Sequence, residues 1–461
     1  MSKFHSTINR RDFMKGLGLA GAGLGAAAAA APVFHDLDEL ASSPSGLTKR
    51  PWWVKTVDEP TVEVDWNSIQ RFDQTGTGYI SSPDFGQHYE NVRQAILNNE
   101  DGNTLRDHAL FVGGEWSMFG WPAETGQSFV THPDVSGAAY VQDKDTAKDM
   151  GVPRWEGTTE ENLRMMRSII SYYGGADGGA VELNDETRKL ILSADYYGKP
   201  YVFEDVDEAY ETVAKYVIPN KCRWIINFHV LQNGAAGKVL QSALAYSAVY
   251  MAYAHADLIC RRLQEFLHVL GYQGLGKNPG AIIGYANLAG LGELGRHMIE
   301  ISPVHGSLIR EPAMLITDLP LAPTKPINFG AYKFCYSCGK CADNCPGSAI
   351  PTATEPSWDV AGFWNMPGTR CWFNDRSKCQ PYGWKYMNAG GCDNCQVVCP
   401  FSSLGKASIH EVVKSIITNT SIFNGFFFNM DSFFYGGSDH TAEDWWNRDL
   451  SKYPYDTTLG R

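Results

Sequence analysis

Hydrophobic and polar positions alternate with two different periods along the middle of the chain, and the pattern predicts both helices and strands. Apolar side chains recur at helical spacing over Glu160–Tyr173. The short, almost continuously apolar run Trp224–Leu231 is typical of a buried strand. Gln241–Leu270 predicts a long helix that ends at Gly271, because glycine readily adopts the left-handed backbone that follows many helices. Residues from about 81 to 276 therefore indicate a region that mixes helices and strands.

Small residues and prolines mark the segments on either side of this region. Gly274–Leu294 is rich in Gly and Ala, which indicates either close approach of the backbone to a bulky group or tight helix packing. Residues 42–66 look irregular, and we interpret Trp52 and Trp53 there as surface anchors, with a lid as the alternative. A linker is predicted at Pro320, Pro323 and Pro326.

The N-terminus has the pattern of an export signal. Arg10 and Arg11 form a twin-arginine pair, and a mildly apolar, Gly/Ala-rich stretch follows from Gly16 to Ala31. This stretch is too short and too rich in glycine for a transmembrane helix. We therefore predict that residues 1–31 are a cleaved signal peptide, recognised by the twin-arginine export machinery.

Charge limits the partners of the chain. The 461 residues carry a formal net charge of −12, which disfavours nucleic acid and anionic lipid as partners. No segment beyond the signal is both long enough and free enough of charges to span a membrane. Any attachment to a membrane is therefore expected to come from a separate protein.

Two cysteine runs near the C-terminus have ferredoxin-type spacing. The first begins at Cys335 and reads Cys-x2-Cys-x2-Cys-x3-Cys-Pro. The second begins at Cys392 and reads Cys-x2-Cys-x3-Cys-Pro, with Cys379 thirteen residues upstream. Two [4Fe–4S] clusters need eight thiolates, and these positions supply eight. Paired cysteines also hold zinc, but the spacing and its near repeat favour clusters.

The ligand sets follow from a known exchange between the runs. In two-cluster domains the last cysteine of each run ligates the other cluster. We therefore predict that cluster 1 is held by Cys335, Cys338, Cys341 and Cys399. Cluster 2 is then held by Cys345, Cys379, Cys392 and Cys395.

Three of the eleven cysteines remain, and an odd remainder argues against a disulfide framework. Cys222 and Cys260 are expected to pack in the core, whereas Cys371 is a rival to Cys379 as a cluster ligand. Thiols in an oxidising compartment normally form disulfides. Twin-arginine export transports folded proteins, so cytoplasmic machinery can load the clusters first.

Several further segments, together with these motifs, make the chain resemble the corrinoid-dependent reductive dehalogenases of organohalide-respiring bacteria. The likeness covers most of residues 1–410 in consistent order. Its segments, besides the signal and the cysteine runs, are Ile218–Cys222, Leu270–Tyr272, Ala289–Gly292, Ile301–Gly306, Thr317–Leu321 and Lys325–Gly330. The chain lacks Asp-x-His-x-x-Gly, and so lacks the usual histidine-on corrinoid module, as this family does.

The resemblance implies a nitroreductase-like α+β or α/β domain that buries a base-off, cobalamin-type corrinoid, followed by a ferredoxin-like domain with two [4Fe–4S] clusters. The implied limits are 32–325 for the corrinoid-binding catalytic domain, 326–410 for the cluster domain and 411–461 for a C-terminal extension packing on the core. The implied reaction replaces a carbon–halogen bond by carbon–hydrogen, with cob(I)alamin as the reductant and the clusters as its electron supply. The corrinoid-contacting residues are not identified by the sequence.

The resemblance also implies three active-site residues. Tyr253 falls on the position of the family's proton donor, and Arg310 on that of an arginine beside it. A neighbouring guanidinium favours phenolate and would make Tyr253 a better acid. The third residue, an asparagine, would fall on Pro279, so Asn278, or alternatively Lys277, takes its place. From the residues alone, Tyr253 would more often belong to an aromatic core stripe with Tyr246 and Tyr250, and Arg310 to a surface ion pair.

As a terminal reductase of organohalide respiration, the protein is expected on the outer, periplasmic face of the cytoplasmic membrane. Its expected partners are a halogenated organic substrate, a small hydrophobic anchor subunit and a respiratory electron donor. Two alternatives remain. One is a corrinoid and iron–sulfur enzyme similar to epoxyqueuosine reductase, which modifies tRNA, and the other is a non-catalytic electron-transfer protein. The export signal and the acidic composition disfavour the first. The glycine-rich region and the order of the matched segments disfavour the second.

Overall fold

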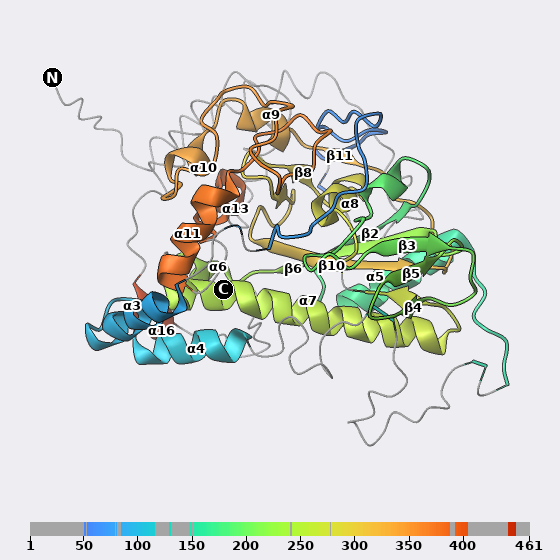
Figure 1. Ribbon diagram of the computed structural model, residues 1–461, viewed down its shortest axis with the longest axis horizontal. Helices are drawn as coiled ribbons and strands as arrows, with labels where there is room; N and C mark the ends of the chain where they lie inside the picture. Colours follow the sequence, from blue (N-terminus) through green and yellow to red (C-terminus); the bar gives the residue numbers. More distant parts are fainter. Residues whose placement is uncertain are drawn as a thin grey trace, which may run out of the picture. The chain divides into compact units, whose positions relative to one another are not determined.

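A four-stranded antiparallel sheet lies at the centre of the fold (Figure 1). Its order is β2 (Asp177–Glu182), β6 (Trp224–Leu231), β10 (Ile309–Thr317) and β7 (Gly274–Leu275). The register of β10 on β6 shifts between Arg310 and Ala313, where the strand has a bulge. Six consecutive residues of β6 are buried, so this strand is covered on both faces, as its apolar sequence predicts.

The coordinates are a computed structural model of the 461-residue chain. The structure describes residues 50–51, 53–78, 80, 84–115, 129–130, 147–148, 151–239, 242–276, 278–387, 392–403 and 441–448. Residues Arg50–Arg461 form one compact unit.

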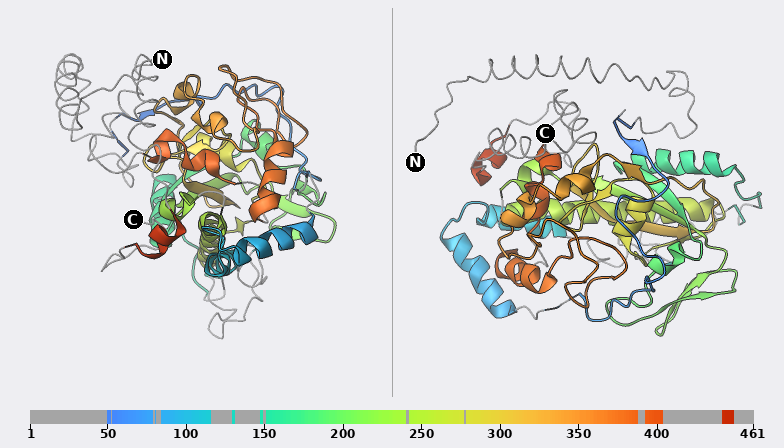
Figure 2. Two further views of the ribbon diagram at one scale, coloured as in Figure 1. Left: turned by 90° about the vertical axis from the view of Figure 1, so that its left-hand side faces the viewer. Right: turned by 90° about the horizontal axis from the view of Figure 1, so that it is seen from above.

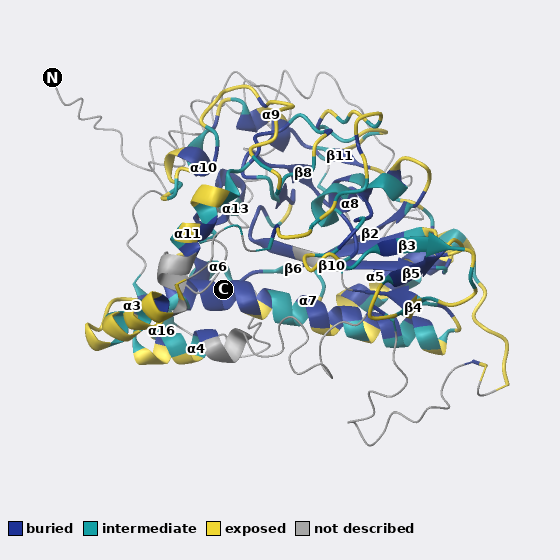
Figure 3. Ribbon diagram, viewed as in Figure 1, coloured by how far each residue is buried: buried dark blue, intermediate teal, exposed yellow. Residues whose placement is uncertain are grey.

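The long helix α7 (Ala243–Val269) covers one face of the sheet, and α8 (Ile282–Leu288) lies on the other (Figure 1). Ser242 caps α7 by accepting a hydrogen bond from the backbone N–H of Ala245. Beyond the helix, Gly271 has φ +89°, the left-handed conformation that the sequence predicts there. Buried residues dominate the central strands and the side of α7 that faces them (Figure 3).

Shorter elements surround this core. The other helices are α3 (Phe85–Leu97), α4 (Leu105–Glu115), α5 (Thr159–Tyr172), the 3-10 helix η2 (Thr187–Leu190), α6 (Gly234–Gly237), α9 (Ala331–Cys335), α10 (Lys340–Asp343), α11 (Arg376–Met387), α12 (Asn394–Val397), α13 (Pro400–Ser403) and α16 (Ala442–Trp446). The other strands are β1 (Lys55–Thr56), β3 (Tyr201–Glu204), β4 (Tyr210–Glu211), β5 (Tyr216–Pro219), β8 (Glu293–Leu294), β9 (Glu300–Ile301) and β11 (Ile327–Asn328).

Helices α9 and α10, which carry predicted cluster ligands, lie on the α8 side of the sheet, and α11 reaches toward α3 (Figures 1 and 2). The early segment of the chain packs into the same part. Strand β1 pairs with β11, and Val64 forms a bridge with Thr369. Trp53 is only 2% exposed and packs edge-on against Phe329, which corrects its interpretation as a surface anchor. Trp52 lies outside the described residues.

Two glycines of the Gly/Ala-rich segment lie close to the backbone of strands and loops of the protein itself, and not in a tight helix–helix contact. Gly290 has φ +69°, and a Cβ there would lie 2.0 Å from the carbonyl oxygen of Lys325. A Cβ on Gly292 would lie 2.4 Å from both the Glu300 side chain and the Ile301 carbonyl. Larger residues therefore cannot replace these glycines without moving the backbone.

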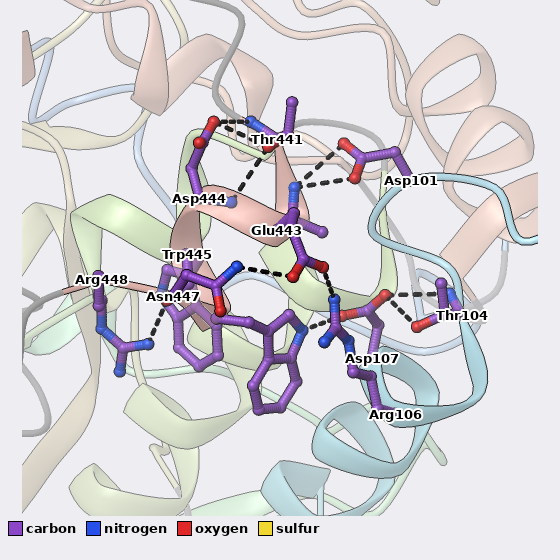
Figure 4. Close-up of polar contacts among 12 residues, drawn as sticks. Asp101, Thr104, Arg106, Asp107, Thr441, Glu443, Asp444, Trp445, Asn447 and Arg448 are labelled. Carbon is purple, nitrogen blue, oxygen red and sulfur yellow. Dashed lines mark hydrogen bonds and ion pairs between the residues drawn. The ribbon is translucent and has the colours of Figure 1, made fainter.

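The described C-terminal residues dock α16 onto the start of α7 and onto α4. Arg106 forms an ion pair with Glu443, and the carboxylate of Asp101 accepts a hydrogen bond from the backbone N–H of Ala442 (Figure 4). The Trp446 indole donates a 2.6 Å hydrogen bond to buried Asp107. Residues 441–448 of the predicted extension therefore pack on the core, while the domain limits themselves stay predictions.

Candidate active site and cluster sites

Four thiols of the first predicted ligand set surround one cavity. Cys335 ends α9, Cys341 lies in α10, and Cys399 follows α12. Together with Cys338 they line a single cavity, which Arg296 and other residues complete. The pKa of the Cys335 thiol is raised well above its ordinary value, first by burial and then by its three cysteine neighbours. This is the arrangement that a [4Fe–4S] cluster requires, because its four thiolates bind different corners of one cube.

The second predicted set also comes together. Cys379 lies on α11, while Cys392 and Cys395 flank the start of α12. Burial, together with the neighbouring thiols of Cys392 and Cys345, raises the pKa of Cys379 to about 12. Cys395 has a strongly raised pKa because of burial and the nearby thiols of Cys341, Cys379, Cys392 and Cys345. Cys395 and Cys341 therefore mark where the two sets adjoin.

Cys371 lies in a different environment from Cys379. It is fully buried in the hydrophobic core with Trp372, and its sulfur contacts the Thr369 hydroxyl at 3.7 Å. Burial raises its pKa to about 11, and no cysteine contributes to that shift. This environment favours Cys379 as the ligand. Cys222 and Cys260 are buried in the core, as expected.

Among the described residues, no three His, Cys, Asp or Glu side chains are placed to hold a single metal ion. The cysteines of the first set line a cavity, which suits a polynuclear cluster.

The aromatic stripe of α7 divides into a core part and an edge. Tyr246 and Tyr250 are buried and pack with Phe111, whose ring lies 5.2 Å from that of Tyr250. Burial raises the pKa of Tyr246 well above its ordinary value, so it stays a neutral core residue. Tyr253 is only partly buried at the edge of this cluster, and Cys392 packs against the same cluster. Core packing thus accounts for two of the three tyrosines.

Arg310 meets Tyr253, as the resemblance implies. Its guanidinium carbon lies 5.4 Å from the centre of the Tyr253 ring. Arg310 is 5% exposed and forms an ion pair with Asp393. The ion pair is therefore buried, and the alternative of a surface ion pair is wrong. Arg310 also donates a 2.5 Å hydrogen bond to the side-chain oxygen of Gln396.

Asn278 has a different set of contacts. Its φ is +45°, and its side-chain oxygen accepts a 3.0 Å hydrogen bond from the backbone N–H of Met314 in β10. No contact in the described residues joins Asn278 to Tyr253 or Arg310, so its catalytic role stays a prediction. Lys277 lies outside the described residues.

Sequence reasoning missed the residues that hold Arg310. Gln396 is fully buried and spans from Arg310 to the backbone oxygen of Ser307, to which it donates a 2.6 Å hydrogen bond. Asp393 has φ +53° and caps α12. Both residues lie between Cys392 and Cys399. This position between two predicted cluster ligands is the only feature of the sequence that indicates a role in the site.

A second missed group consists of buried polar side chains on and after β6. His229 is fully buried, and neither ring nitrogen has a hydrogen-bond partner in the described structure. Burial lowers its pKa to about 4, so the ring is neutral near pH 7. Both side-chain amide atoms of Gln232 and the amide oxygen of Asn227 likewise lack partners among the described residues. An unsatisfied buried polar group costs roughly 1–3 kcal/mol, and a polar ligand that bound these atoms would remove that cost.

The predicted signal peptide, including Arg10 and Arg11, lies outside the described residues. Within the described ranges, no helix is both long enough and apolar enough to cross a membrane.

Two families match this chain. The family described as "Reductive dehalogenase subunit" matches residues 49–321. The family described as "4Fe-4S double cluster binding domain" matches residues 334–402, which include all eight predicted cluster ligands.

Named relatives match along the whole length. The chain is 34% identical to a chloroethene reductive dehalogenase of Dehalococcoides mccartyi strain VS, over 99% of each chain. It is 30% identical to a trichloroethene reductive dehalogenase of strain ATCC BAA-2266 / KCTC 15142 / 195, covering 96% of this chain and 97% of the relative.

The fold also matches a solved reductive dehalogenase whose structure suggested a mechanism for B12-dependent dehalogenation. The TM-score is 0.59 at 18% identity, and the match covers 89% of this chain and 53% of that one. The chain thus spans about half the length of that solved protein.

These matches confirm the predicted family, fold class, enzyme class and pairing of a corrinoid with two [4Fe–4S] clusters. The full-length likeness also favours this assignment over a tRNA-modifying enzyme or a simple electron carrier. The chain belongs to the reductive dehalogenase family, and it is an oxidoreductase that acts on carbon–halogen bonds.

Proposed function

We propose that this enzyme removes chlorine from chlorinated ethenes as the terminal reductase of organohalide respiration. The observation that carries the substrate class is the 34% identity over 99% of the chain to a chloroethene reductive dehalogenase. The reaction consumes the chlorinated substrate, two electrons and one proton, and it yields the C–H product and chloride.

The corrinoid is held, in this proposal, by the buried polar groups on and after β6. The rim of a corrinoid carries amide side chains that both donate and accept hydrogen bonds. Neutral His229 and the side-chain amide of Gln232 can do the same, which fits the cofactor chemically. When bound, the corrinoid supplies the strongly reducing cobalt centre that breaks the carbon–halogen bond.

Tyr253 donates the proton and Arg310 assists it. The Tyr253 hydroxyl is the donor atom, and loss of its proton leaves a phenolate. The Arg310 guanidinium over the ring stabilises that negative charge. Because Arg310 is only 5% exposed, this attraction is stronger than it would be between the same groups in water. Gln396 and Asp393 hold the guanidinium in place.

The second cysteine run brings electrons to the same place. Cys392 packs on the aromatic cluster that includes Tyr253, and Asp393 and Gln396 of the same run contact Arg310. The segment that binds cluster 2 thus also orients the group beside the proton donor. This arrangement supports a site where electron delivery and proton donation are close together.

The enzyme works on the outer face of the cytoplasmic membrane. The twin-arginine pair at Arg10 and Arg11 supports export in the folded, cluster-loaded state. A small hydrophobic anchor protein holds it there, and a respiratory donor supplies its electrons.

A substrate screen tests the proposed class. Reconstituted, pre-reduced enzyme should release chloride from tetrachloroethene, trichloroethene and chloroethene, and gas chromatography should show the matching less chlorinated products. Chlorinated phenols and chlorinated ethanes serve as comparison substrates, and corrinoid-free protein as the blank. Faster turnover of a chlorophenol than of every chloroethene would contradict the substrate class while leaving the enzyme class intact.

A further inference from the structure

A buried arginine lies beside the cavity of cluster 1. Arg296 belongs to the turn between β8 and β9 and is 2% exposed. It lines the cavity together with the four cysteines of the first set. Its backbone N–H points at the sulfur of Cys335 at 3.4 Å. Arg296 can therefore interact with the predicted cluster in two ways, through its backbone N–H and through the positive charge of its guanidinium.

Among the described residues, the hydrogen-bond acceptors of the Arg296 guanidinium are all neutral backbone carbonyls. It donates to the backbone oxygen of Cys335 at 2.7 Å, of Pro351 at 2.9 Å and of Ala353 at 2.6 Å. Its central carbon lies 4.5 Å from the centre of the Trp372 ring. None of the ion pairs found among the described residues includes Arg296.

The arginine beside cluster 2 is balanced differently. Arg310 contacts the loop between Cys392 and Cys399, but it forms an ion pair with Asp393 of that loop. Arg376 also lies near the cluster 2 ligand Cys379, but it is only partly buried, so solvent screens its charge more than that of Arg296. Of the two buried arginines beside the clusters, only Arg310 is paired with a carboxylate among the described residues.

A buried cation without a carboxylate is costly unless another negative group compensates it. A [4Fe–4S] cluster with four thiolates carries net negative charge, and that charge grows when the cluster accepts an electron. A nearby positive charge and an N–H···S contact both make the extra electron more favourable, which raises the reduction potential.

We propose that Arg296 is the counter-charge of cluster 1 and makes it the higher-potential centre of the two. Each cluster takes up one electron from an external donor, and no bond is formed or broken in that step. Electrons entering the oxidised protein therefore settle first on cluster 1. This proposal rests on the cluster ligand sets and is independent of the chlorinated substrate.

An anaerobic redox titration of the loaded enzyme, followed by electron paramagnetic resonance, tests this directly. Titrations compare the wild type with Arg296→Gln and Arg296→Met, which remove the charge, and with Arg296→Lys, which keeps it. The signal lost in Cys338→Ser identifies cluster 1. Iron content is measured on every sample.

In the neutral variants, the potential of cluster 1 should become more negative by at least 59 mV, which is a tenfold change in the ratio of reduced to oxidised cluster. The potential of cluster 2 should stay in place, and Arg296→Lys should recover most of the shift. The matched control is Arg370→Gln, which removes an equal charge from a partly exposed residue that is paired with Glu63 and Glu355. Solvent and the two paired carboxylates screen the charge of Arg370, so its removal should leave the potential of cluster 1 unchanged.

Unchanged potentials in fully loaded Arg296→Gln or Arg296→Met protein would overturn the proposal. So would an equal shift in Arg370→Gln, or a wild type in which cluster 1 has the lower potential. If neither neutral variant retains cluster 1 but Arg296→Lys does, the counter-charge is needed for assembly, and the order of the two potentials in the wild type and in Arg296→Lys decides the proposal. If Arg296→Lys also loses cluster 1, the arginine acts through packing and the proposal fails.

Discussion

Arg310 joins two parts of the chain that are far apart in sequence. It lies over the ring of Tyr253 from α7 and binds Gln396 from the second cysteine run. The resemblance to the family supplied Tyr253 and Arg310 as a pair, and the structure brings them together. Gln396 was not predictable, because its role depends on a long-range contact rather than on any local pattern.

Replacing Tyr253 by Phe tests the proton donor. The substitution keeps the ring and removes only the hydroxyl, so corrinoid and iron contents should stay unchanged. Dehalogenation should fall by about 10²–10⁴-fold if proton transfer limits the rate. The control is Tyr250→Phe, the same change in a buried tyrosine of the same stripe, which should keep near-normal turnover. Equal activities in the two loaded variants would reduce Tyr253 to a packing residue.

His229 predicts a pH dependence of stability in corrinoid-free protein. Burial lowers its pKa to about 4, against 6.5 for an ordinary histidine. Between these values the unfolded chain binds more protons than the folded one, so the free energy of unfolding falls as the pH falls. From about pH 7.5 to about pH 5.5, His229 should account for a loss of roughly 1 kcal/mol.

Anaerobic urea unfolding at the two pH values measures this loss, and His229→Gln should reduce it. If both proteins lose the same free energy of unfolding, the imidazole is not neutral and buried as described.

At the scale of elements, local patterns predicted the central ones well. The strand Trp224–Leu231 has the predicted bounds, and α7 ends at Val269 before Gly271, close to the predicted end. Both signals are local: an apolar run and a glycine terminator. The burial of Trp53 could not be predicted in this way, because it depends on a partner, Phe329, that lies far along the chain.

The helix α11 gives a test of the cluster ligands. Loaded wild-type protein should contain about eight irons, the sum of two four-iron clusters. Cys379→Ser should lose cluster 2 and roughly half of that iron, because its thiol adjoins Cys392 and Cys345. Cys371→Ser should keep both clusters, since that thiol packs beside Trp372 and no neighbouring cysteine contributes to its raised pKa. Iron analysis and electron paramagnetic resonance decide between them, and iron loss confined to Cys371→Ser would reverse the assignment.

At the scale of the whole molecule, the cluster part and the sheet are built into one unit. Strand β1, early in the chain, pairs with β11 just before the first cysteine run. Backbone N–H of Arg370 donates to the carbonyl of Glu63, again joining early and late segments. The domain limit at residue 325 was predicted from the proline-rich linker. That local signal could not reveal that residues 53–64 pack against the cluster part.

The proposed export is a hypothesis about the whole protein. Replacing both Arg10 and Arg11 by Lys should strand cluster-loaded precursor in the cytoplasm, because the export receptor reads the arginine pair as an address. Protease added to intact cells should digest the wild-type protein and spare the variant, with a cytoplasmic marker protein as the control. Wild-type protein that is protected in intact cells and soluble after lysis would refute the proposed location.

Single-turnover chloride release tests the central claim most directly. Fully loaded enzyme is reduced, freed of excess reductant and mixed anaerobically with trichloroethene, and the chloride released is compared with the electrons lost from the protein. We predict one chloride for every two electrons, and none from protein that carries both clusters but no corrinoid. Chloride release by corrinoid-free protein, or oxidation of the enzyme without chloride, would contradict the account.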